Sequence, residues 1–326
     1  MTAPYVFRLL CLSLSSFFLI HLVLALLVRL VAPFAIRWAQ RRDARAAVRV
    51  TLVVRFLPFG FAVLTVAATC VPSYLRFEPR DITEPVGWAC LIGAALSAAI
   101  CVASIVRGLR AWAHSIGYAR SYGQDARPMR FPATGASILV VEDDAAAVLL
   151  AGILRPRLLV SSAALGALSG EELAVALRHE HAHRAARDNF KRLLLLLVPD
   201  VLPFCHIFRP LERAWARFSE WAADDAAASG DPARSVSLAA ALVHLARLRV
   251  PSGSSPLVTS LLADGSDLAA RVERLLNTPS KSSHPARATS FVTTIATAFA
   301  LAGTATLLIV HTSLLSVHAA LERLIH

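Results

Sequence analysis

Residues 9–28 read LLCLSLSSFFLIHLVLALLV, twenty residues that include one histidine and no charged side chain. A helix needs roughly 20 apolar residues in succession to cross the hydrocarbon core of a bilayer. The apolar run continues past Arg29 to Ile36, and no small-residue cleavage site follows it. We therefore interpret this stretch as a retained membrane anchor and not as a cleaved signal peptide.

Three further stretches are long and apolar enough to span a membrane. They cover residues 56–75, 86–106 and 288–317, and none of them contains a formal charge. The sequence therefore predicts a mainly α-helical integral membrane protein with about four transmembrane helices. The following boundaries are expected: a membrane domain at 1–106, a second domain at 107–287, the fourth transmembrane helix at 288–317 and a short extracellular tail at 318–326.

The charged residues give the expected orientation. The chain has a net charge of +11 and is 56% hydrophobic, which excludes a disordered chain and an ordinary soluble enzyme. Arginines are concentrated in the loop 33–50 and again after residue 106. The positive-inside rule places both regions in the cytoplasm, with the N-terminus outside. Because no helix-turn-helix pattern or aromatic-interleaved basic patch is present, we expect no direct nucleic-acid binding.

The region between the last two predicted spans changes in character. Short leucine- and valine-rich runs at residues 137–142, 147–150 and 158–161 predict a small antiparallel β-sheet. Ser169 and Glu172, three residues apart, have the form of a capping box that starts a helix.

That capped helix should run to about residue 187. Two more helices are expected at about 210–229 and 233–249. The apolar run 193–208 is interrupted by two prolines, so whether it enters the membrane is left open.

The capped helix contains the motif His179-Glu180-His181-Ala182-His183. Histidines four residues apart lie on one face of a helix, so both imidazoles can reach a single metal ion. Glu180 projects beside such an ion and is the expected general base for an attacking water. His181 should point away from the pair.

A catalytic zinc site uses three protein ligands and an open position. Glu220, on the helix predicted at about 210–229, is the expected third ligand. Asp224 follows one helical turn later and is placed to accept a hydrogen bond from a histidine ligand. The sequence thus predicts one Zn²⁺ per chain and zinc-dependent peptide hydrolysis, with no residue assigned to oxyanion stabilisation.

Six short runs occur in the order of a known family: GILRPRLLV at 152–160, LSGEEL at 168–173, HEHAH at 179–183, RDN at 187–189, EWAAD at 220–224 and DLAARVERLL at 267–276. They resemble the zinc peptidase domain of the BlaR/MecR-type membrane metallopeptidases, the β-lactam sensor-transducers of bacteria. The resemblance implies zinc ligation by His179, His183 and Glu220, Glu180 as base and Asp224 behind the ligands. It also implies a cytoplasmic peptidase domain on a bacterial inner membrane.

The family's usual substrate is a cytoplasmic repressor of the BlaI/MecI type, which makes a transcriptional repressor the candidate protein substrate. The sensor members continue into an extracellular penicillin-binding domain. This chain stops nine residues beyond Val317, so direct antibiotic sensing by a domain of its own is not expected.

Two alternatives stay open. An HtpX-like quality-control metalloprotease shares the HExxH motif and the later ExxxD element. It usually has glycine where this chain has Ala182. A non-catalytic membrane signalling or scaffold protein would belong to another class, and the complete set of expected catalytic residues argues against it.

Overall fold

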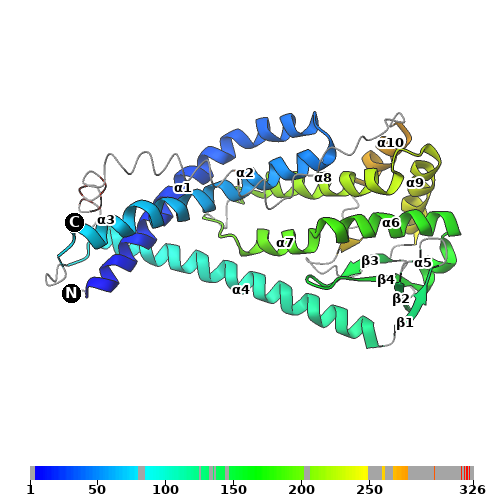
Figure 1. Cartoon of the computed structure of the whole chain (residues 1–326), viewed down its shortest axis with the longest axis horizontal. Helices are drawn as coiled ribbons and strands as arrows, with labels where there is room; N and C mark the ends of the chain where they lie inside the picture. Colours follow the sequence, from blue (N-terminus) through cyan, green and yellow to red (C-terminus); the bar gives the residue numbers. More distant parts are fainter. Residues whose placement is uncertain are drawn as a thin grey trace.

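The computed structural model describes residues 4–79, 85–124, 126–131, 135, 137–143, 147–201, 206–248, 259–260 and 267–277, together with five single positions nearer the C-terminus. Three long helical runs dominate this part of the chain (Figure 1). They are α1 (Tyr5–Gln40), the unbroken run of α2 (Ala44–Thr65), the π-helical turn η1 (Val66–Cys70) and α3 (Val71–Phe77), and α4 (Trp88–Gln124).

Within the described residues, these three runs are long and apolar enough to cross a membrane. They contain the first three predicted spans, which are thereby confirmed as candidate transmembrane helices. The predicted fourth span at 288–317 lies outside the described residues, apart from two single positions. Each run extends beyond its apolar stretch: 36 residues give α1 a length of about 54 Å. Similarly, α4 continues through residue 106 without a break, so the two expected domains share a helix.

In the part of the chain that the structure describes, the sheet has five strands in the order β1-β2-β4-β3-β5. Their bounds are β1 Arg127–Arg130, β2 Ser137–Val141, β3 Val148–Ala151, β4 Arg157–Ser161 and β5 Thr259–Ser260. The expectation of an antiparallel sheet is wrong at one pair, because β4 inserts between β2 and β3 and runs parallel to β2. All four residues of β3 are buried, and so are the last four of the five residues of β4. This burial favours central positions in the sheet for both strands. The edge strands β1 and β5 were not expected.

Among the described residues, six helices follow β4: α5 (Ser162–Ala167), α6 (Gly170–Ala186), α7 (Asp188–Leu197), α8 (Arg209–Ala228), α9 (Pro232–Arg247) and α10 (Leu268–Asn277). The capping box is present: the Ser169 hydroxyl accepts from the Glu172 amide, and the Glu172 carboxylate accepts from the Ser169 amide. The predicted helices agree with α6, α8 and α9 to within about two residues.

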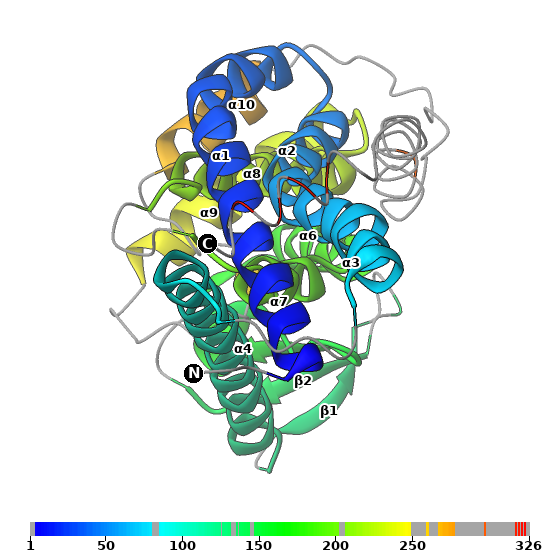
Figure 2. The same cartoon turned by 90° about the vertical axis from the view of Figure 1, so that its left-hand side faces the viewer.

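The sheet, α6, α9 and α10 lie at one end of the molecule, and α3 lies with the N-terminus at the other (Figure 1). Viewed from the α3 end, α6 and α7 lie behind the long helices (Figure 2). The long helix α2 is connected to α8 by a packed interface. In it, Leu52 and Phe56 of α2 are buried against Trp215 and Phe218 of α8. Helix α8 therefore joins the candidate membrane helices to the rest of the fold.

The segment after α7 also packs against a membrane helix. Val201, Ile207 and Phe208 form a buried cluster with Ala25 and Val28 of α1. These contacts place Val201, Ile207 and Phe208 beside the end of the first apolar stretch.

Candidate metal centre

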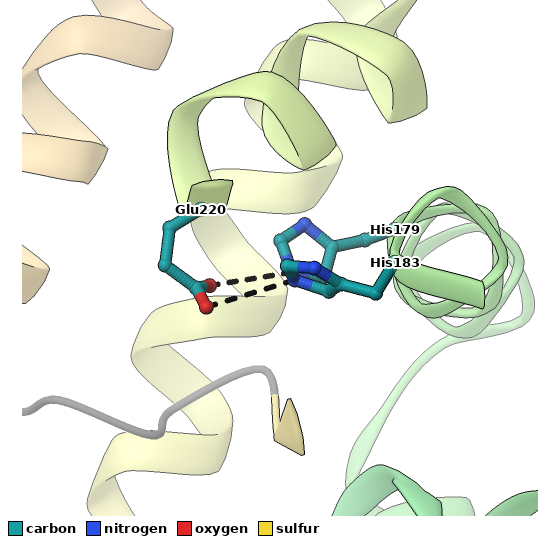
Figure 3. Close-up of side chains that lie close together, drawn as sticks. All are labelled: His179, His183 and Glu220. Atoms are coloured by element: carbon teal, nitrogen blue, oxygen red, sulfur yellow. Dashed lines mark hydrogen bonds and ion pairs between the residues drawn. The ribbon is translucent and has the colours of Figure 1, made fainter. Parts of the chain in front are cut away.

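Two histidines and one glutamate converge between α6 and α8. His179 and His183 lie one turn apart on α6 and point toward Glu220 of α8 (Figure 3). Their Nε2 atoms are 3.1 Å apart. Glu220 Oε2 lies 3.5 Å from His179 Nε2, and Oε1 lies 3.6 Å from His183 Nε2. All three side chains are buried, and one donor atom from each lies within 4.8 Å of the other two, so the group can hold a metal ion.

Each histidine is oriented by a carboxylate on the far side of its ring. Asp224 Oδ1 lies 2.9 Å from His179 Nδ1, and Asp188 Oδ2 lies 2.7 Å from His183 Nδ1. A carboxylate at Nδ1 favours a proton on that nitrogen and leaves the Nε2 lone pair for a metal. The structure therefore brings Asp224 to the position expected from the sequence.

Asp188 is a residue of the cluster that motif spacing did not identify. Arg187 adopts the left-handed conformation, with φ of 55°, and this turn folds Asp188 back beneath His183. Asp188 also accepts hydrogen bonds from Lys191 at 2.8 Å and Ser219 at 2.7 Å. Burial on its own raises the pKa of Asp188, but His183 and Lys191 together hold it well below its usual range. Asp188 is thus a permanent anion behind the second histidine.

Arg271 of α10 is the second residue that the sequence did not assign. Its guanidinium donates to both carboxylate oxygens of Asp224, at 2.9 Å to Oδ2 and 2.6 Å to Oδ1. Its Nη1 lies 3.1 Å from Glu220 Oε2. The sequence of α10 is part of the family resemblance. The spacing between residues along the chain, however, gave no reason to place Arg271 at the metal centre.

Glu180 is fully buried on α6, next to His179 in sequence. Neither of its carboxylate oxygens has a hydrogen-bond partner in the part of the chain that the structure describes. Burial raises the pKa of Glu180 to about 7. A buried carboxylate without a partner is costly, which is consistent with a role toward a group that the chain does not supply. The neighbouring His181 is exposed and takes no part in the cluster.

The buried charges of the centre do not cancel. Around the centre, the buried charged groups among the described residues are four carboxylates and two cations: Glu180, Asp188, Glu220 and Asp224 against Lys191 and Arg271. With all four carboxylates ionised, these groups sum to −2, which a divalent cation would balance with both imidazoles neutral. Burial on its own lowers the pKa of His183, but the carboxylates of Glu220 and Asp188 raise it to about 10. The donor set of two imidazoles and a carboxylate is one that Zn²⁺ prefers.

Comparison of the chain with protein-family models, curated proteins and solved structures finds no match. The chemical interpretation of the centre therefore depends on its own geometry and charge.

Proposed function

We propose that the protein is an integral-membrane zinc endopeptidase, with His179, His183 and Glu220 as ligands and Glu180 as the general base. The observation that carries this proposal is the convergence of three buried donors beside a buried carboxylate without a partner. Structural zinc sites usually have four protein ligands, whereas catalytic sites have three and keep one position open. Three donors converge in the described residues, which favours catalysis over a purely structural ion.

A bound zinc ion would supply Lewis acidity, acidifying a water molecule and polarising a peptide carbonyl. The residues of the chain supply the remaining functions. Glu180 accepts a proton from the attacking water and passes it to the leaving amine. Asp224 and Asp188 hold the two imidazoles with Nε2 directed at the centre. Because these groups are buried, they are already oriented before a substrate arrives.

The membrane part gives the proposed location. Three candidate spans support association with a lipid bilayer. The arginine-rich loop at 33–50 and the region after residue 106 favour a cytoplasmic peptidase domain. The resemblance to the BlaR/MecR-type peptidases adds a bacterial inner membrane as the proposed location. The proposed substrate is a protein or peptide at the cytoplasmic side, and a BlaI/MecI-type repressor is the leading candidate.

Metal analysis of the purified full-length protein tests the site. We expect about one zinc per chain in the wild type and none after replacing both His179 and His183 by alanine. His181→Ala is the matched control, because this exposed histidine lies in the same motif but outside the cluster. Unchanged zinc content in the double variant would contradict the assignment.

Comparison of cell proteomes tests the activity and the substrate. Glu180→Gln should retain zinc and lose proteolysis, so the intact substrate should accumulate relative to wild-type cells. A single accumulating repressor supports a regulatory protease, whereas many accumulating membrane proteins support an HtpX-like quality-control role. Identical proteomes in cells that express the protein would count against a peptidase.

A further inference from the structure

One guanidinium contacts both acids that α8 contributes to the metal centre. Arg271 is 4% exposed, and it reaches the site from α10, a helix whose Leu275 is buried in the core with α6 and α9. Its Nε and Nη2 bind the two oxygens of Asp224, while its Nη1 lies beside Glu220 Oε2. A planar guanidinium with its donors in a fixed fork can impose this geometry on two carboxylates, whereas a single ammonium group cannot.

These contacts treat the two oxygens of Glu220 differently. Oε2 lies 3.1 Å from Arg271 Nη1 and 3.5 Å from His179 Nε2. Oε1 lies 3.6 Å from His183 Nε2, and the Nη2 atom of Arg192 is farther from it, at 3.9 Å. The ion pair of Arg271 with Oε2 thus leaves Oε1 as the oxygen available to a metal ion.

The contacts to Asp224 act on the first histidine ligand. Asp224 Oδ1 lies 2.9 Å from His179 Nδ1 while it accepts from Arg271 Nη2. With both carboxylate oxygens bound to one guanidinium, the carboxylate plane is fixed against the imidazole. Arg271 therefore acts on two of the three metal ligands without being a ligand itself.

We infer that Arg271 is a positioning residue of the metal centre: it restricts Glu220 to coordination through one oxygen and holds Asp224 against His179. The inference rests on the proposed function insofar as it requires a metal ion bound by these ligands. One-oxygen coordination keeps a position of the ion open for substrate or water, as a catalytic site needs.

Charge and geometry make opposite predictions for the loss of Arg271. If Arg271 acted only through its positive charge, its removal would make the centre more acidic and tighten the binding of a divalent cation. If it acts by positioning, removal frees Glu220 and Asp224 and weakens binding, by about 10- to 100-fold for residues that orient ligands. The direction of the change in affinity therefore separates the two roles.

The test uses Co²⁺ binding to the full-length protein in detergent, because the visible absorption of Co²⁺ reports its coordination geometry. We expect Arg271→Gln to bind Co²⁺ more weakly, with fainter visible bands as Glu220 becomes bidentate. Arg271→Lys keeps the charge but lacks the fork, and should show the same fainter bands. Arg274→Gln is the matched control: Arg274 lies one turn later on α10 and pairs with Asp225 at 2.7 Å, outside the centre. Its spectrum and affinity should equal those of the wild type.

Equal or tighter Co²⁺ binding by Arg271→Gln, or a wild-type spectrum for Arg271→Lys, would overturn the inference and leave the proposed function intact. If Arg271→Gln does not fold, the spectrum of Arg271→Lys decides alone. If the wild-type protein itself binds no Co²⁺, the proposed metal site fails, and the positioning role fails with it.

Discussion

Arg55 of α2 donates a hydrogen bond from Nε to Glu212 Oε1 of α8 at 2.9 Å, which joins a candidate membrane helix to the helix of the metal centre. Arg55 is 2% exposed, and its guanidinium lies 4.1 Å from the ring of Phe208. Glu212 precedes Glu220 by eight residues on α8, a rise of about 12 Å along the helix. A single helix thus contacts the candidate membrane helices at one end and contributes Glu220 to the candidate metal centre further along.

The two partners of this ion pair should respond differently to substitution. Glu212→Gln leaves the charge of buried Arg55 without its partner, which we expect to cost about 3 kcal/mol of folding free energy. Arg55→Met should cost less, because the stem still packs on Phe208 and the Glu212 side chain is 38% exposed and can be hydrated. Thermal unfolding of both variants in detergent measures the difference.

A surface pair provides the control for that comparison. Arg127 and Glu142 lie 3.1 Å apart, but their side chains are 83% and 76% exposed. Arg127→Met should leave the unfolding temperature unchanged, since exposed ion pairs contribute little. A larger loss for Arg55→Met than for Glu212→Gln would contradict the argument from burial.

Asp188→Asn should weaken zinc binding by about 10- to 100-fold. The substitution removes the anion that holds the proton on His183 Nδ1, and an amide nitrogen at that position would favour the other tautomer, which blocks Nε2. Competition with a chromogenic chelator measures the affinity. Asp225→Asn is the matched control on α8, because Asp225 pairs with Arg274 and not with a ligand. Equal affinities for the two variants would show that Asp188 does not orient His183.

Zinc should stabilise the folded protein, because a divalent cation balances the two surplus negative charges of the centre. Ligand binding to the native state alone contributes about 2.7 kcal/mol when the free ligand is at 100 times its Kd. We therefore expect the unfolding temperature to fall when a chelator removes zinc and to recover when zinc is returned. The double variant of His179 and His183 should not respond to either treatment. A wild-type protein that unfolds at the same temperature with and without chelator would argue against a bound structural or catalytic ion.

Local periodicity explains which parts of the site could be predicted. His179 and His183, and likewise Glu220 and Asp224, are paired by the four-residue repeat of a helix, which the sequence displays directly. The start of α6 was also predictable, because the capping box of Ser169 and Glu172 depends on neighbours three residues apart.

Residues brought to the site by tertiary structure could not be predicted in this way. Asp188 reaches His183 only because Arg187 takes a left-handed conformation, and nothing in its side chain requires one. Arg271 is 47 residues from Asp224 in the chain, and its position depends on how α10 docks. The parallel pairing of β2 with β4 is a similar case, because strand order depends on which strand is central and not on the pattern within a strand.

Two glycines of α4 should differ sharply in their tolerance of a side chain. A Cβ atom at Gly93 would lie 2.5 Å from Ser15 Oγ, 3.2 Å from its Cβ and 3.4 Å from its Cα, so α1 and α4 approach closely at this point. A Cβ atom at Gly117 would meet nothing within 4 Å. Gly93→Leu should push the two helices apart and destabilise the protein by about 1–3 kcal/mol or more. Gly117→Leu should be neutral or stabilising by up to about 1 kcal/mol, because leucine is the better helix former. Thermal unfolding of the two variants side by side measures the contrast, and similar unfolding temperatures would mean that α1 and α4 do not pack through Gly93.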